Sequence, residues 1–151
     1  MQIVGLDHVQ LAMPRGKEAQ ARAFYSEILG LPEAPKPPTL AVRGGVWFEH
    51  GTVKIHLGVE EDFRAARKAH PALLVKDLAK LMSTLSENGY DVIEDTAIPG
   101  VTRAFSNDPF GNRIEFIQDE TVIPPFCEGV ISRNFMRPSA TASVVHHRLP
   151  C

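Results

Sequence analysis

Hydrophobic and polar residues alternate along several short stretches of this chain, and the stretches follow one another in a repeated order. Residues 3–12 alternate as a strand does, with Leu6, His8, Gln10 and Ala12 on one side. Residues 17–30 place apolar residues at roughly helical spacing, and Gly30 stands where such a helix should end. The pattern therefore predicts a strand followed by a helix.

The next stretch predicts three strands after an irregular link. Prolines are frequent in residues 32–38, so we expect no regular element across them. The runs 39–44, 46–51 and 52–59 each read as a short strand, and the Gly44–Gly45 and His50–Gly51 pairs mark the turns between them.

The same order of elements recurs in the second half. Residues 70–75 predict a strand, and residues 77–89 predict a helix that begins after Asp77 and ends at Gly89. Its apolar face contains Leu78, Leu81, Met82 and Leu85. The runs 90–95, 101–107 and 113–118 predict three more strands.

This repeat predicts the fold class. Each half reads strand–helix–strand–strand–strand, and one such unit cannot close its own sheet, so two must combine. We expect an α+β fold of two βαβββ modules in tandem, with curved mixed or antiparallel sheets around a cleft and the helices outside. The first module spans 1–58, a linker 59–69, the second module 70–118, and an extended tail 119–151.

Composition excludes some classes of function. The chain has 151 residues and a net charge of −2, which gives no electrostatic case for nucleic acid. No apolar run approaches the roughly 20 residues that span a bilayer, so we expect no membrane partner. Cys127 and Cys151 lack metal-type spacing, and we expect a reducing cytoplasm. The tail also carries His146 and His147, which we interpret as solvated.

Four residues at matched positions of the two halves suggest a metal site. His8 and His70 lie in the first strand of each half, and His56 and Glu115 lie in the last. Imidazole and carboxylate together suit Zn, Ni, Co, Mn or Fe. Taken singly, each histidine also fits a structural role, and Glu115 also fits a solvent-facing pair with Arg113, two residues away.

The stretch Asn107–Phe116 shows why the side on which Glu115 lies matters. Asp108-Pro109-Phe110-Gly111 fits a type I turn, with Pro preset at the second position. Such a turn sets the register of the following strand, and the register decides whether Glu115 faces solvent or a site.

Several segments resemble the vicinal oxygen chelate superfamily, which includes glyoxalases, extradiol dioxygenases, fosfomycin-resistance thiol transferases, methylmalonyl-CoA epimerases and bleomycin-binding proteins. The resemblance covers about residues 3–118 and rests on the "LDHVQLAMP" strand, the "FYSEILGL" helix end and the "NDPFGNRIEF" turn and strand. It implies His8, His70 and Glu115 as metal ligands. The family's fourth position varies and holds His56 here, where glyoxalases I usually carry Glu.

The resemblance implies a glyoxalase-like, metal-dependent enzyme with lyase or isomerase chemistry on a small substrate that chelates the ion through vicinal oxygens. Glu115 would be the catalytic residue that moves a proton. Two alternatives stay open: a metal-free drug- or metabolite-binding protein of the bleomycin-resistance kind, and an extradiol-type Fe(II) dioxygenase. Because related proteins are dimers and one module is incomplete alone, we expect a homodimer.

Other residues are candidates for the substrate pocket. Trp47 and Phe48 would form an apolar wall, although core packing is the preferred explanation for them. Arg43, Lys54, Arg103 and Arg113 lie on predicted strands, where one or two of them would meet an anionic group, or else each lies on a solvated face.

Overall fold

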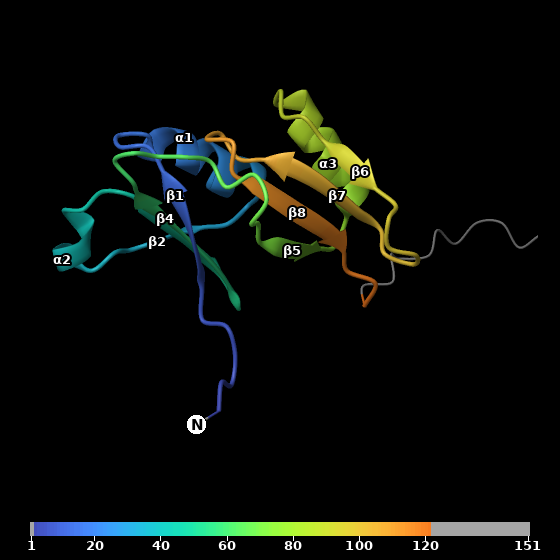
Figure 1. The fold of residues 1–151 in the computed structure, drawn as a ribbon, viewed down its shortest axis with the longest axis horizontal. Helices are drawn as coiled ribbons and strands as arrows, with labels where there is room; N and C mark the ends of the chain where they lie inside the picture. The colour runs from blue at the N-terminus through green and yellow to red at the C-terminus, as the bar shows by residue number, and fades with distance from the viewer. Residues whose placement is uncertain (1, 122–151) are drawn as a thin grey trace, which may run out of the picture.

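Two four-stranded sheets lie side by side in the computed structural model, which describes residues 2–121 (Figure 1). The first half comprises β1 (Val9–Met13), α1 (Glu18–Arg22), the π-helical turn η1 (Ala23–Ile28), β2 (Glu33–Ala34), α2 (Pro38–Ala41), β3 (Val46–His50) and β4 (Val53–Val59). The second half comprises β5 (Ala72–Val75), α3 (Leu78–Glu87), β6 (Ile93–Asp95), β7 (Arg103–Asn107) and β8 (Arg113–Gln118).

The two sheets have the same topology. Their strand orders are β1-β4-β3-β2 and β5-β8-β7-β6. In each, the first strand pairs in parallel with the last, and the other pairs are antiparallel. The predicted α+β fold of tandem βαβββ modules is therefore confirmed. The predicted tail lies almost entirely outside the described residues.

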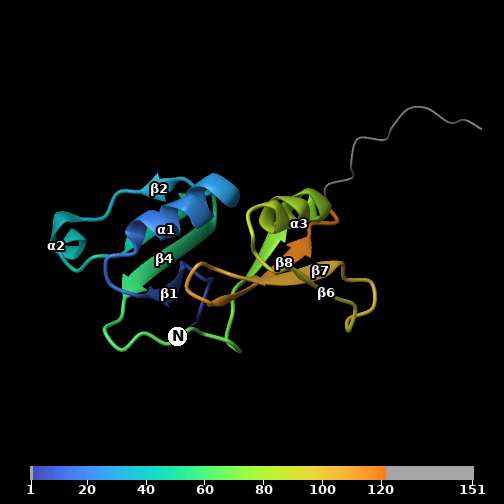
Figure 2. The same ribbon diagram turned by 90° about the horizontal axis from the view of Figure 1, so that it is seen from above.

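The helices begin and end where local chemistry favours it. The Asp77 side chain accepts a hydrogen bond from the Lys80 amide at 2.9 Å and caps α3, as predicted. Gly89 and Gly30 follow the two main helices with φ of 81° and 71°, a conformation that glycine adopts without strain. Figure 2 shows α1 and α3 on the same side of the two sheets. None of the helices within residues 2–121 has the length and apolarity to cross a membrane.

The region between η1 and β3 differs from the prediction. Residues 39–44 were predicted as a strand, but they contain most of α2, because Pro38 takes the first turn of a helix, where its fixed φ fits and no amide is needed. The fourth strand is β2 at the sheet edge, inside the link that was predicted to be irregular. Gly45 then passes so close to β4 that a Cβ would lie 2.2 Å from the Leu57 carbonyl oxygen.

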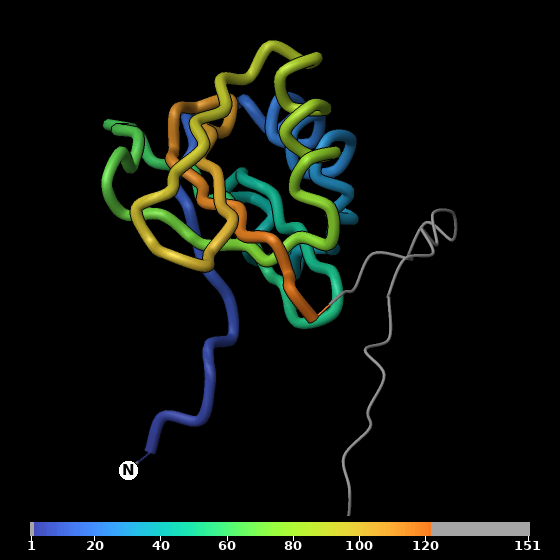
Figure 3. The backbone as a smooth tube through the Cα atoms, turned by 90° about the vertical axis from the view of Figure 1, so that its right-hand side faces the viewer, coloured from blue at the N-terminus to red at the C-terminus, as the bar shows by residue number. Residues whose placement is uncertain are grey.

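The N-terminal strand is shorter than predicted. It begins at Val9, and residues 2–8 run away from the body of the molecule (Figure 3). Ile3 and Val4 are 92% and 94% exposed in this N-terminal arm. His8 therefore lies immediately before β1 rather than within it.

Each sheet has one core face and one open face. On β4 and β8 the buried positions Ile55, Leu57, Ile114 and Phe116 alternate with polar ones. The core faces pack against α1, η1 and α3, and their side chains belong to one cluster that spans both halves. The open faces carry the candidate functional side chains, which include His56 and Glu115.

A buried polar cluster joins the two halves. The Asn112 amide donates to the Ala12 carbonyl at 2.9 Å and to the Asp108 carboxylate at 2.8 Å, and its oxygen accepts from the Ala66 amide. The Tyr25 hydroxyl donates to Asp108 at 3.0 Å. Because all these groups are satisfied, the cluster fixes how the halves meet. The predicted turn ends here, with the Gly111 amide donating to the Asp108 carbonyl at 3.0 Å.

Candidate functional site

The open face of the first sheet holds a stack of three rings. The His56 ring lies 4.1 Å from Trp47, nearly parallel to it, and 4.4 Å from His8 on its other side. The register explains half of this stack, because Trp47 is directly opposite His56 on β3. His56 is buried, and its Nε2 lies 3.2 Å from Glu49 Oε1.

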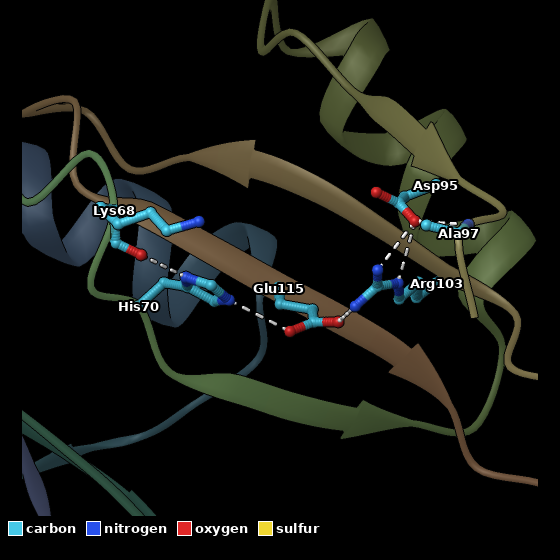
Figure 4. A network of polar contacts seen from close by, with 6 residues as sticks. All are labelled: Lys68, His70, Asp95, Ala97, Arg103 and Glu115. Carbon is cyan, nitrogen blue, oxygen red and sulfur yellow. Dashed lines mark hydrogen bonds and ion pairs between the residues drawn. The ribbon is translucent and has the colours of Figure 1, made fainter.

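The open face of the second sheet holds an ion-pair network instead (Figure 4). His70 Nε2 lies 3.1 Å from Glu115 Oε2, and the Arg103 Nη1 donates to Glu115 Oε1 at 2.8 Å. Arg103 also donates to Asp95 through Nε and Nη2. Glu115 is only 7% exposed, so the solvent-facing alternative is wrong. Its cation is Arg103, whereas Arg113 lies over the Phe105 ring.

The pKa directions in this network follow from the pairing. Hydrogen bonds from the Ala97 amide and from Arg103 hold the pKa of Asp95 below its usual value. The carboxylates of Asp95 and Glu115 together raise the pKa of Arg103, with Asp95 contributing most. Arg103 is therefore a permanent cation that keeps one Glu115 oxygen engaged.

Backbone contacts orient the histidines differently. His70 Nδ1 lies 2.8 Å from the Lys68 carbonyl oxygen, which can only accept, so Nδ1 carries a proton and Nε2 points at Glu115. His8 Nδ1 lies 2.8 Å from Asp7 Oδ1. Such second contacts through Nδ1 are typical of histidines that bind a metal through Nε2. Within residues 2–121, His56 has no hydrogen bond at Nδ1 and is held through Nε2 by Glu49, which sets it apart from the other two.

The two histidines that are held through Nδ1, His8 and His70, line one cavity. It has a volume of about 390 Å³ and is bounded by the end of the N-terminal arm, by the start of β4 and by β5, with His8 and His70 in its wall. Within residues 2–121, however, no cluster of three potential ligands is close enough to hold one ion. The folded chain thus presents a pair, His70 and Glu115, and a separate histidine, His8.

The donor chemistry of the pair fits a divalent metal. Two donors that each lie about 2.0–2.2 Å from one ion are separated by roughly 2.9–3.5 Å, and the two atoms of His70 and Glu115 are 3.1 Å apart. At this separation a proton or a metal ion fits between the Nε2 atom and the carboxylate oxygen. His70 and Glu115 therefore fit as two ligands, and a third must come from elsewhere.

The structure places the other predicted pocket residues in different surroundings. Trp47 lies on the open face, but Phe48 is fully buried and stacks on Tyr25 at 5.1 Å in the core, so it cannot form a pocket wall. Period-two alternation explains the difference, since neighbouring residues of a strand face opposite sides. Lys54 pairs with Asp7, and Arg43 lies in the turn after α2 beside a separate cavity of about 250 Å³.

The prediction of the site omitted Asp95, and it treated Arg103 only as a strand residue that could meet an anionic group. Both lie on predicted strands, and both face the same side as Glu115, because Phe105 is opposite Glu115 and Asp95 is opposite Arg103. Alternation alone places Arg103 and Phe105 on one face, but only the pairing register between β7 and β8 brings that face to Glu115. A charged residue within each predicted strand was the available signal, although Asp95 ends β6 and Arg103 begins β7.

Comparison with known proteins places the chain in a family. Residues 5–116 match the model of the Glyoxalase/Bleomycin resistance protein/Dioxygenase superfamily. A putative glyoxalase family protein from Bacillus anthracis has a similar structure, with 48% identity, a TM-score of 0.76, and coverage of 80% of this chain and 98% of that one. Among curated protein sequences, none matches.

More distant solved structures share the fold. The fosfomycin resistance protein FosX from Listeria monocytogenes is 15% identical, with a TM-score of 0.63 over 78% of this chain and 95% of that one. The antibiotic-binding protein TnmS3 from a Streptomyces species is 21% identical, with a TM-score of 0.60 over 78% and 98%. The chain thus belongs to the Glyoxalase/Bleomycin resistance protein/Dioxygenase superfamily.

Proposed function

We propose that this chain is a metal-dependent enzyme that acts on a small substrate through two adjacent substrate oxygens, with lyase or isomerase chemistry. The observation that supports it best is the His70–Glu115 pair, whose facing atoms lie 3.1 Å apart while Nδ1 of His70 is tied to the backbone. A lone histidine with a solvated glutamate would need no such arrangement.

The residues would divide the work as follows. His70 Nε2 and Glu115 Oε2 would hold the ion, which is one of Zn, Ni, Co, Mn or Fe, and His8 Nε2 is the proposed third donor. A bound divalent ion would supply Lewis-acid polarisation of the substrate oxygens. Glu115 is also the proposed catalytic residue, which accepts or returns a substrate proton at a carboxylate oxygen. Arg103 would fix the orientation of the Glu115 carboxylate through its hydrogen bond to Oε1.

His56 has a supporting role in this proposal. Its Nε2 contacts Glu49, and its ring lies between Trp47 and His8. We therefore assign His56 to the placement of the His8 ring rather than to the fourth ligand position.

The proposal includes a homodimer, in which a second copy of the chain would cover the N-terminal arm that carries His8. The N-terminal arm carries the exposed side chains of Ile3, Val4 and Leu6 directly before His8. Covering this apolar arm is favourable by roughly 25 cal/mol per Å² of buried surface, and a homodimer would provide the cover. Sedimentation equilibrium should give twice the chain mass at micromolar concentration, and a monomer mass would contradict this part of the proposal.

Metal analysis tests the proposed function directly. The wild-type protein, stripped with chelator and then titrated with Zn, Ni, Co, Mn and Fe(II), should bind one of them stoichiometrically. His70→Ala should weaken that binding by at least about tenfold. His50→Ala is the matched control, because His50 is exposed at the end of β3, and it should bind as wild type does. Failure of the wild-type protein to bind any of the five ions would refute the proposal.

One observation favours a second candidate, a metal-free protein that sequesters a drug or metabolite. Glu115 already has a cation in Arg103, and the described part of one chain assembles no cluster of three donors. Tight binding of an organic ligand by chelator-treated protein, together with no uptake of metal, would support sequestration. Selective uptake of Fe(II), together with oxygen consumption when a catechol is added, would instead support the dioxygenase alternative.

A further inference from the structure

A second cavity adjoins the His70–Glu115 pair on the open face of the second sheet. Its volume is about 620 Å³, and residues of the linker, β6, β7 and the start of β8 line it. Phe105 forms part of its wall and also meets the His70 ring edge to face, with centroids 5.4 Å apart. Phe105 is opposite Glu115 in the β7–β8 register. A ligand in this cavity would therefore be separated from the His70–Glu115 pair by the ring of Phe105.

Arg113 presents to this cavity a charge that is held in place but has no ion pair within residues 2–121, although it also acts on Asp95 and lowers the pKa of that residue. Its guanidinium carbon lies 3.8 Å from the centroid of Phe105, so the group is stacked against the ring. Among residues 2–121, no carboxylate lies within ion-pair distance of Arg113 or of Arg67, the second arginine of the wall. The N–H groups of a guanidinium point outward in the plane of the group, so contact of its face with a ring leaves them able to bind a carboxylate.

The acids of the wall leave room for an anion. Asp95 is bound to Arg103 through two hydrogen bonds, so its charge is already balanced in part. Asp91 is the other lining acid, and it has no ion pair within residues 2–121. The two free arginines face this one free acid, and the chain as a whole carries −2. That balance suits a monoanion better than a dianionic phosphate.

We propose that this cavity binds a small organic monocarboxylate with an aromatic or apolar body. The carboxylate would lie on Arg113, assisted by Arg67, and the body would pack on Ile93 and Phe110. The inference deepens the proposed function, because it makes the substrate a compound that carries a carboxylate besides its two adjacent oxygens. The binding itself requires no metal.

Three benzene derivatives of different charge test the proposal on chelator-treated protein. Calorimetric or NMR titration should show that benzoate binds at least about tenfold more tightly than neutral benzamide or cationic benzylamine, since charged hydrogen bonds to a guanidinium exceed neutral ones. Arg113→Gln should weaken benzoate binding by about tenfold and remove the preference for it over benzamide. Arg64→Gln is the matched control, because Arg64 is exposed and outside the cavity, and it should not change binding.

Several results would overturn this inference. They are no detectable benzoate binding, equal binding of benzoate and benzamide, tighter binding of benzylamine, or unchanged benzoate affinity in Arg113→Gln. Should Arg113→Gln fail to fold, Arg113→Lys provides the second variant, which keeps the charge and should still bind benzoate more weakly than wild type. Because these titrations contain no metal, their failure would leave the metal proposal standing, and a negative metal titration would leave this result intact.

Discussion

The first sheet carries stacked rings on its open face, whereas the second sheet carries an ion-pair network at the matching positions. His8 corresponds to His70, and His56 corresponds to Glu115 by strand and register. Trp47 and Phe105 also correspond, since each lies directly opposite the central residue of the last strand. The scaffold thus repeats positions faithfully, while the side chains at those positions have diverged in charge.

The core faces show the opposite behaviour. Leu57 and Phe116 occupy matched core positions, and both belong to one apolar cluster. The comparison teaches that the two halves are distinct on the side where chemistry occurs and shared on the side that stabilises the fold. Three predictions test this contrast, and they follow in order of expected effect.

The largest effect on stability should come from truncating a core side chain in either half. Leu57→Ala should lower the free energy of unfolding by about 2–5 kcal/mol, and Phe116→Ala by about 3–5 kcal/mol. Trp47 is the only tryptophan and lies in the first half. Its fluorescence should nevertheless report the Phe116→Ala loss at the same urea concentration as circular dichroism does. Separate transitions would show that the halves unfold independently.

A smaller effect should come from the polar cluster at the junction. Burial raises the pKa of Asp108 above its ordinary 3.8, although hydrogen bonds from Asn112, Phe110 and Tyr25 oppose the rise. A raised pKa in the folded state means that the stabilising contribution of the carboxyl group is present below about pH 4 and is lost as the pH rises through the raised value.

The variant Asp108→Asn should therefore not lose stability from this group as the pH rises. The free energy of unfolding of the wild-type protein, minus that of the variant, should fall as the pH is raised from about 4. Urea unfolding at a series of pH values measures the difference, and Asp91→Asn, an exposed site, is the control. A difference that stays constant or grows with pH would contradict the assignment.

The smallest effects should distinguish the two open faces. Arg103→Gln removes the cation shared by Glu115 and Asp95, and it should lower the unfolding temperature more at low salt than at high salt. His56→Phe keeps a ring between Trp47 and His8, and it should cost less than about 1 kcal/mol with no salt dependence. Thermal unfolding at two salt concentrations measures both. Equal salt dependence of the two variants would contradict the distinction between the stacked rings of the first sheet and the ion pairs of the second.

The predicted elements held best where the deciding contacts are local. The helix 78–87 followed from its apolar spacing, the Asp77 cap and Gly89, all within one stretch of chain. The strand 39–44 was wrong, because a proline pair that starts a helix outweighed weak strand propensity. Phe48 was assigned to the pocket only because its face could not be chosen before the register of β3 was known.

The sequence by itself determined the repeat, the four matched positions and the turn that sets the register of β8. These depend on periodicity and on turn residues, which act over a few neighbours. Tertiary structure alone decided that Arg103 rather than Arg113 binds Glu115, that His56 lies between two rings, and that Tyr25 reaches Asp108 across 83 positions of the chain. Such pairings depend on how strands and modules meet in space, and no short-range pattern encodes that distance.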